Sequence, residues 1–141
     1  MKLIQLVYKS TATSTNSDEF EDILHVARTK NAKKGITGML MFHDKTFYQC
    51  IEGDESIINE LYSKIYIDDR HFNVRLLGKI EIEKRSFSDW EMGFINMYSK
   101  ELSNQGFNDV NKSIDLIESN PKSLVKFMEY FIDQISLIKA S

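Results

Sequence analysis

The stretch KTFYQCIEG at residues 45–53 has the pattern of a β-strand that carries one polar residue on its buried face. Successive side chains of a strand point to opposite sides of the sheet, so Phe47, Gln49 and Ile51 share a face. Phe47 and Ile51 are expected to face the core, and they take the Gln49 amide with them. A buried amide without a partner costs roughly 2–7 kcal/mol. The pattern therefore predicts a polar partner for Gln49, either a protein group or a bound ligand.

The periodicity around this strand predicts the element order β-α-β-β-α-β-β. Strands are expected at about 3–9, 35–42, 46–53, 74–80 and 92–97, and amphipathic helices at about 16–31 and 54–65. In the fourth strand, apolar or small residues alternate at Val74, Leu76, Gly78 and Ile80. This order predicts a ferredoxin-like α+β fold, with two helices on one face of an antiparallel or mixed sheet.

The pattern changes after Lys100. Short helices are predicted near residues 110–118 and after Asn120-Pro121, where proline suits the first helical turn. The second helix has an apolar stripe at helical spacing: Leu124, Phe127, Met128, Phe131, Ile135 and Ile138. We expect one domain at residues 1–97 and a C-terminal helical extension at 98–141 that covers the open face of the sheet. Contact of this extension with a partner protein is the alternative.

The composition excludes several classes of function. The chain has 141 residues, 42% hydrophobic and 28% charged, with a net charge of -3, which is typical of one globular domain. It has no basic stripe for nucleic acid and no apolar run of the ~20 residues that a membrane span needs. The three histidines and the single Cys50 lack metal-ligand spacing, so no metal is expected. We expect a soluble cytoplasmic protein without a signal peptide, and a homo-oligomer is possible.

Three polar side chains are predicted to converge between the sheet and the helices. Tyr8 shares a strand face with Ile4 and Leu6, and Asn31 follows Ala27 by four residues on the buried stripe of the first helix. A phenol and two amides, counting Gln49, are typical of a site for a flat polar heterocycle. Two alternatives stay open at this stage. Asn31 could be a left-handed helix C-cap, and Gln49 could bond a neighbouring backbone group.

Five blocks of the sequence together resemble the BLUF family of blue-light receptors, which bind a flavin, usually FAD. The blocks are VYKS at residues 7–10, NAKKGITGML at 31–40, FYQCIEG at 47–53, DDRH at 68–71 and FSDWEMG at 87–93. The resemblance covers residues 1 to about 97. It implies FAD as the cofactor, with FMN possible.

The resemblance also implies where the flavin would lie. Its ring would enter edge-on between the two helices, with Ile23 and Ile65 against its faces. Asn31 would bond the C4 carbonyl and N3 edge. Gln49 would lie between the Tyr8 hydroxyl and flavin N5.

Further residues have implied roles at the ring and tail. Arg70 and His71 would contact the C2 carbonyl or the ribityl and phosphate tail, with Asp68 a weaker candidate. Trp90 and Met92 match the two residues that compete for the place beside the glutamine. A departure occurs at Lys30, where many relatives carry an Asn or His as ring ligand.

The implied function is light sensing. Excited flavin would take an electron from Tyr8, Gln49 would relay the proton, and the rotated or tautomerised amide would shift the flavin spectrum slightly to the red. The signal would pass through the fifth strand and C-terminal helices to an unidentified protein partner, without enzymatic activity and without direct contact to nucleic acid or membrane. The alternative is a ferredoxin-like small-molecule-binding or acylphosphatase-type domain, for which residues 9–13 are a faint candidate anion loop.

Overall fold

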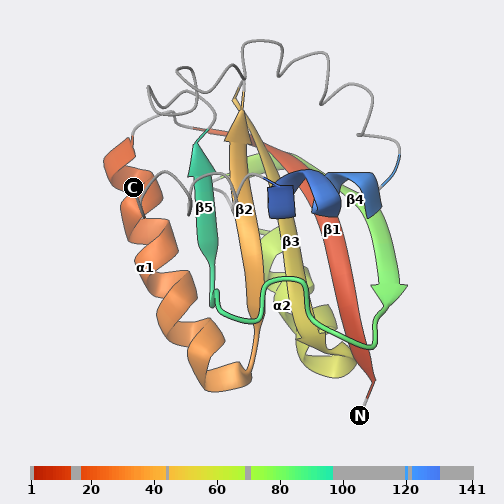
Figure 1. Ribbon diagram of the computed structural model, residues 1–141. Helices are drawn as coiled ribbons and strands as arrows, with labels where there is room; N and C mark the ends of the chain where they lie inside the picture. The colour runs from red at the N-terminus through yellow and green to blue at the C-terminus, as the bar shows by residue number, and fades with distance from the viewer. Residues whose placement is uncertain are drawn as a thin grey trace, which may run out of the picture.

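The seven predicted elements are present in the predicted order (Figure 1). The structure is a computed structural model that describes residues 2–13, 17–43, 45–68, 71–96, 120 and 122–130, with the backbone alone at 17–21, 71, 72 and 96. The elements are β1 (Leu3–Ala12), α1 (Ser17–Lys34), β2 (Thr37–His43), β3 (Thr46–Asp54), α2 (Glu55–Tyr66), β4 (His71–Glu81) and β5 (Gly93–Asn96). The ferredoxin-like α+β architecture is confirmed.

The five strands form one mixed sheet in the order β4-β1-β3-β2-β5. β1 pairs antiparallel with β3 and β4, β2 pairs antiparallel with β3, and β5 runs parallel to β2. The fifth strand was expected to begin at Met92 but begins at Gly93, so Met92 belongs to the segment before the strand. The expected end at residue 97 lies outside the described residues.

Alternation along the strands divides the core into two clusters, one on each face of the sheet. The cluster under α1 and α2 includes Ile4, Leu6, Tyr8, Leu24, Leu40, Phe47, Ile51, Ile58 and Met92. The opposite cluster includes Val7, Met39, Met41, Tyr48, Cys50, Phe87 and Ile95, together with Leu124, Val125 and Met128.

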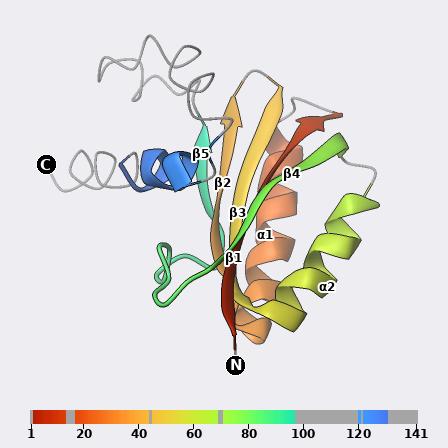
Figure 2. The same cartoon turned by 90° about the vertical axis from the view of Figure 1, so that its right-hand side faces the viewer.

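Figure 2 shows the helical segment at residues 122–130 on the side of the sheet away from α1 and α2. Asn120 caps this segment, because its Oδ1 accepts the backbone N–H groups of Lys122 and Ser123 at 3.1 and 3.4 Å. The prediction that a C-terminal helix covers the open face is confirmed for these residues. The helix expected at 110–118 and the stripe positions Phe131, Ile135 and Ile138 lie outside the described residues.

Helix α1 ends at Lys34, just before Gly35, and not at Asn31. Gly35 has a φ of 68°, and the Ile36 N–H donates to the Asn31 carbonyl oxygen at 3.0 Å. This bond from C″ back to C3 is that of a Schellman motif, with glycine as the left-handed residue. The alternative interpretation of Asn31 as a left-handed cap is therefore wrong. Asn31 lies inside the helix, with its side chain buried.

The fourth strand departs from the alternation expected for it. Leu76 pairs with Tyr8, on the helix-covered face, whereas Gly78 pairs with Val7, on the opposite face, because the register shifts between these pairs. A one-residue bulge at Leu77 accounts for the shift, since each inserted residue exchanges the two faces of a strand. The predicted common face of Val74, Leu76, Gly78 and Ile80 is therefore wrong.

None of the helices in the described ranges is both long and apolar enough to cross a bilayer.

Substitution of Gly38 tests the tight approach of β2 to β3. A Cβ at this position would overlap the Cys50 carbonyl oxygen. Gly38→Ala is therefore expected to lower the free energy of unfolding by about 1–3 kcal/mol, as measured by urea denaturation. Gly53→Ala is the matched control, because its Cβ would lie 3.4 Å from its nearest neighbours. Equal losses in both variants would contradict this account of the β2–β3 contact.

Candidate functional site

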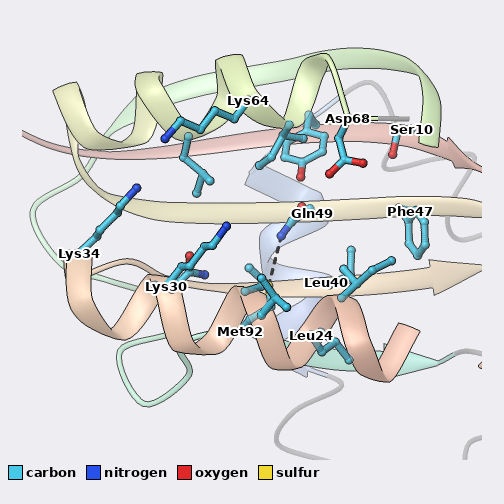
Figure 3. Close-up of a pocket in the computed structure, with 17 residues that line it drawn as sticks. Ser10, Leu24, Lys30, Lys34, Leu40, Phe47, Gln49, Lys64, Asp68 and Met92 are labelled. Carbon is cyan, nitrogen blue, oxygen red and sulfur yellow. Dashed lines mark hydrogen bonds between the residues drawn. The ribbon is translucent and has the colours of Figure 1, made fainter. Parts of the chain in front are cut away.

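A cavity of about 400 Å³ lies between α1, α2 and the helix-covered face of the sheet (Figure 3). Helix α1 and helix α2 form its walls, and β1, β2 and β3 form its floor. Its lining comprises Tyr8, Ser10, Ile23, Leu24, Val26, Ala27, Lys30, Asn31, Lys34, Leu40, Phe47, Gln49, Leu61, Lys64, Ile65, Asp68 and Met92. This volume is within the roughly 300–1,000 Å³ of small-molecule sites.

Tyr8 and Gln49 lie side by side on the floor of the cavity. They are directly paired across β1 and β3, and directly paired residues of adjacent strands point to the same face with Cβ atoms about 4.5–5.5 Å apart. The predicted meeting of the phenol and the amide is thus present in the strand register.

The Gln49 amide donates from Nε2 to the Met92 sulfur at 3.2 Å, the bond drawn as a dashed line in Figure 3. A thioether is a weak acceptor. The sequence predicts a polar partner for Gln49, and the Met92 sulfur is only a weak one. The alternative interpretation was that Gln49 bonds a neighbouring backbone group. Its Nε2 donor instead bonds the Met92 side chain.

Tyr8 is fully buried beside Tyr62, with ring centroids 5.5 Å apart in an edge arrangement. Burial raises the pKa of Tyr8 above its ordinary value, and the nearby Tyr62 and Asp68 raise this pKa further. The phenol therefore keeps its proton at every pH near neutrality.

Two residues of α1 hold the segment before β5 against the cavity. Asn31 Nδ2 donates to the Glu91 carbonyl oxygen at 2.7 Å, and Arg28 Nε donates to the Met92 carbonyl oxygen at 2.9 Å. The amide of Asn31 has a second N–H and an oxygen besides this bond. Asn31 can thus fix the segment and still present polar atoms to a ligand.

Met92, and not Trp90, occupies the place beside Gln49. Met92 is buried, whereas the Trp90 side chain is 41% exposed. Trp90 lies close to Gly93, since a Cβ on Gly93 would be 3.1 Å from the Trp90 ring. The structure therefore places one of the two predicted candidates in the site and the other outside it.

The remaining predicted residues are placed as follows. Ile23 on α1 and Ile65 on α2 line the cavity from opposite walls, and Lys30 and Asp68 also line it. In Figure 3, Lys30 lies with Lys34 and Lys64 toward one end, and Asp68 lies near Ser10 toward the other. Arg70 and the side chain of His71 lie outside the described part of the chain.

Sequence reasoning missed several residues of the site. Lys34 follows Lys30 by four positions, so helical spacing could have placed it on the wall. Arg28 does not line the cavity but holds the Met92 carbonyl, three positions before Asn31. Leu40 could have been found by its pairing opposite Gln49 in the β2–β3 hairpin. Tyr62 of α2, which contacts the Tyr8 ring, was also missed.

The lining fits a flavin in shape and chemistry. Apolar side chains on two facing helices suit the two faces of a flat ring, and the amides of Asn31 and Gln49 can bond its polar edge. Fold and cavity together are typical of a small-molecule-binding α+β domain, with a phenol and two amides lining the cavity.

Residues 3–93 match the family model described as sensors of blue-light using FAD (BLUF). The chain therefore belongs to the BLUF family. This membership makes it a flavin-dependent blue-light sensor with FAD as cofactor, and it does not support the acylphosphatase-type alternative.

Similar proteins include enzyme-linked and short members. The chain is 31% identical to photoactivated adenylate cyclase subunit alpha of Euglena gracilis over 94 residues, which is 64% of this chain and 9% of that protein. A bacterial light-regulated adenylyl cyclase is similar in structure, with a TM-score of 0.73, 29% identity and coverage of 94% and 39% of the two chains. BlsA in its ground state has a TM-score of 0.69 and 27% identity, with coverage of 94% and 86%. The chain thus spans a small part of the cyclases.

The burial of Tyr8 predicts a loss of stability in alkali. Unfolded tyrosine ionises near about pH 10, so above that pH the unfolded chain releases a proton that the folded chain retains. Stability then falls as pH rises, by about 1.4 kcal/mol per pH unit for one such group. Tyr8→Phe should flatten this fall, measured as the melting temperature between about pH 9.5 and 11.5. Tyr66→Phe, at a position 61% exposed, controls for the loss of a hydroxyl, and equal slopes in the two variants would refute the effect.

Proposed function

We propose that this protein detects blue light through the neighbouring side chains of Tyr8, Gln49 and Met92 and passes the signal to a protein partner. The observation that carries the proposal is the paired position of Tyr8 and Gln49, with the amide donor resting on a weak thioether acceptor. An amide held in this way can rearrange at small energetic cost.

FAD is proposed to bind between α1 and α2, and FMN could bind in the same way. Ile23 and Ile65 would contact the ring faces, and Asn31 its polar edge. We assign further contacts to Lys30, Asp68, Arg70 and His71, which lie on the cavity wall or in the segment after α2. In this proposal Trp90 takes part in the light response from outside the cavity, where its ring lies next to Gly93.

The photochemical step uses groups of the chain suited to coupled electron and proton transfer. Bound oxidised flavin would become a strong oxidant on absorbing blue light. Tyr8 would give up an electron to it, which would make the phenol strongly acidic. Gln49 could carry the proton from Tyr8 toward the flavin, because an amide accepts at Oε1 and donates at Nε2. The electron and the proton would then both return to Tyr8, and the change left in the protein would be a rotated or tautomerised Gln49 amide.

The energy available for signalling is small. A rearranged hydrogen bond contributes about 0.5–1.5 kcal/mol, whereas moving a two-state equilibrium from one extreme to the other takes about 5.5 kcal/mol. The light signal therefore biases an equilibrium that is already balanced.

The output path is proposed to run through β5 to the C-terminal helices. Ile95 of β5 shares a cluster with Leu124, Val125 and Met128, so movement of β5 reaches segment 122–130 directly. We divide the chain into a flavin-binding domain at 1–97 and an extension at 98–141 that contacts the partner. The output is binding and not catalysis, in the cytoplasm, and pairing of two copies is compatible with it.

Absorption spectroscopy tests the function directly. Purified protein should be yellow, and blue light should shift its flavin band reversibly to the red. Gln49→Leu should keep the flavin but lose the shift, because leucine can neither accept nor donate a proton.

Met92→Leu is the matched comparison for this variant, because it keeps the volume and removes only the sulfur acceptor. It should keep the shift and change the rate of return in darkness. A normal red shift in Gln49→Leu would contradict the proposed relay, and a protein that cannot be loaded with FAD or FMN would contradict the function. Unchanged amide exchange from Glu91 to Ile138 on illumination would count against the output path.

A further inference from the structure

Strand β3 carries a buried polar residue on the face opposite the cavity. Glu52 is completely inaccessible to solvent, and both of its carboxylate oxygens accept hydrogen bonds. Oε2 accepts from Gln5 Nε2 at 3.1 Å and from the Ser86 backbone N–H at 3.0 Å. Oε1 accepts from Thr37 Oγ1 at 2.9 Å and from the Phe87 backbone N–H at 2.7 Å.

This arrangement depends on a carboxylate. Burial of a charge is unfavourable unless it is well hydrogen-bonded, and here four donors surround two oxygens that only accept. Two of the donors are consecutive backbone N–H groups of the segment between β4 and β5. Glu52 therefore attaches that backbone to β3, the central strand of the sheet.

The fixed backbone leads directly to the cavity. Trp90 N–H bonds the Phe87 carbonyl oxygen at 3.0 Å, and the Trp90 carbonyl oxygen accepts the Gly38 N–H at 2.9 Å. The next two carbonyl groups, of Glu91 and Met92, are held by Asn31 and Arg28. Segment 86–92 is thus attached to the sheet at one end and to α1 at the other.

The same segment also contacts the C-terminal helix. The Phe87 side chain is buried in one cluster with Leu124, Val125 and Met128. Figure 2 shows this segment and the helix at 122–130 on the same side of the sheet. Glu52 bonds the backbone N–H groups of Ser86 and Phe87. These two residues therefore connect the segment that carries Met92 to the helix at 122–130.

We propose that Glu52 is the positioning residue that couples the flavin cavity to the C-terminal helix, by holding segment 86–92 so that a displacement at Met92 reaches Phe87. The coupling of light to this segment rests on the proposed function. The positioning of the segment in darkness does not.

Glu52→Gln removes the carboxylate and nearly preserves its shape. An amide has one oxygen and one NH2 group. Either orientation turns the NH2 toward a backbone donor, Ser86 N–H in one case and Phe87 N–H in the other. One backbone bond to the segment is therefore lost in both orientations.

The dark-state test needs no photochemistry. In Glu52→Gln, the amide protons of Ser86 and Phe87 should exchange roughly tenfold faster or more, as expected for loss of a charge-assisted hydrogen bond. The only tryptophan of the chain is Trp90, so tryptophan emission reports this segment alone and should change as well. Glu55→Gln is the matched control, because it makes the same change in a carboxylate that pairs with Lys2 and Lys79 at the end of the sheet.

The light-state test separates coupling from sensing. Glu52→Gln should keep the red shift, because Tyr8 and Gln49 are untouched, and should lose the light-minus-dark exchange difference at residues 122–130 that the wild type and Glu55→Gln show. Retention of that difference, or Trp90 emission equal to the wild type, would overturn the proposal. Absence of a red shift in the wild type would instead overturn the proposed function, and the dark-state test would still decide the role of Glu52.

Thr37→Val provides a second variant if Glu52→Gln does not fold. It removes one donor to Oε1 together with the acceptor of Arg85 Nη1, and it leaves the carboxylate in place. The same changes in exchange and emission should follow with smaller amplitude, and a Thr37→Val protein identical to the wild type in both would also overturn the proposal.

Discussion

The antiparallel pairing of β1 with β3 is the constraint on which the site depends. It sets Tyr8 opposite Gln49 at the centre of the sheet, on the face that α1 and α2 cover. A shift of one residue would turn both side chains to the other face. The buried apolar neighbours Leu6 and Ile51 prevent this shift, because they too are directly paired and would lose their places in the core. The position of the phenol relative to the amide is thus maintained by the packing of the whole sheet.

Two polar residues of β3, the buried Glu52 and the half-buried Gln49, differ in how well they are bonded. Glu52 has four donors at hydrogen-bonding distance, whereas the Gln49 donor has a thioether as acceptor. Fully bonded buried groups rigidify their surroundings, and weakly bonded ones leave alternatives of similar energy. The strand therefore presents a rigid polar group to one face of the sheet and an adaptable one to the other, three residues apart.

Local periodicity could predict much of the fold and part of the site. Alternation placed Tyr8 and Gln49 on the helix-covered face, and helical spacing placed Asn31 on the buried stripe. The choice of Met92 over Trp90 could not be predicted in this way, because it depends on contacts of α1 with the segment before β5. The bulge at Leu77 has a local signal that the predicted alternation did not use, because Leu76 and Leu77 are consecutive apolar residues and Gly78 follows them. The roles in flavin binding stay predictions, and Arg70 and the side chain of His71 lie outside the described part of the chain.

Asn31 serves three parts of the molecule at once. Its backbone carbonyl accepts the bond that ends α1, its side-chain nitrogen holds Glu91, and its side chain lines the cavity. A replacement here therefore disturbs the helix wall and the β5 approach together with any ligand contact. Weak flavin retention in an Asn31 variant would consequently be an ambiguous phenotype, and only variants that leave the Glu91 anchor intact can isolate the contribution of this amide to affinity.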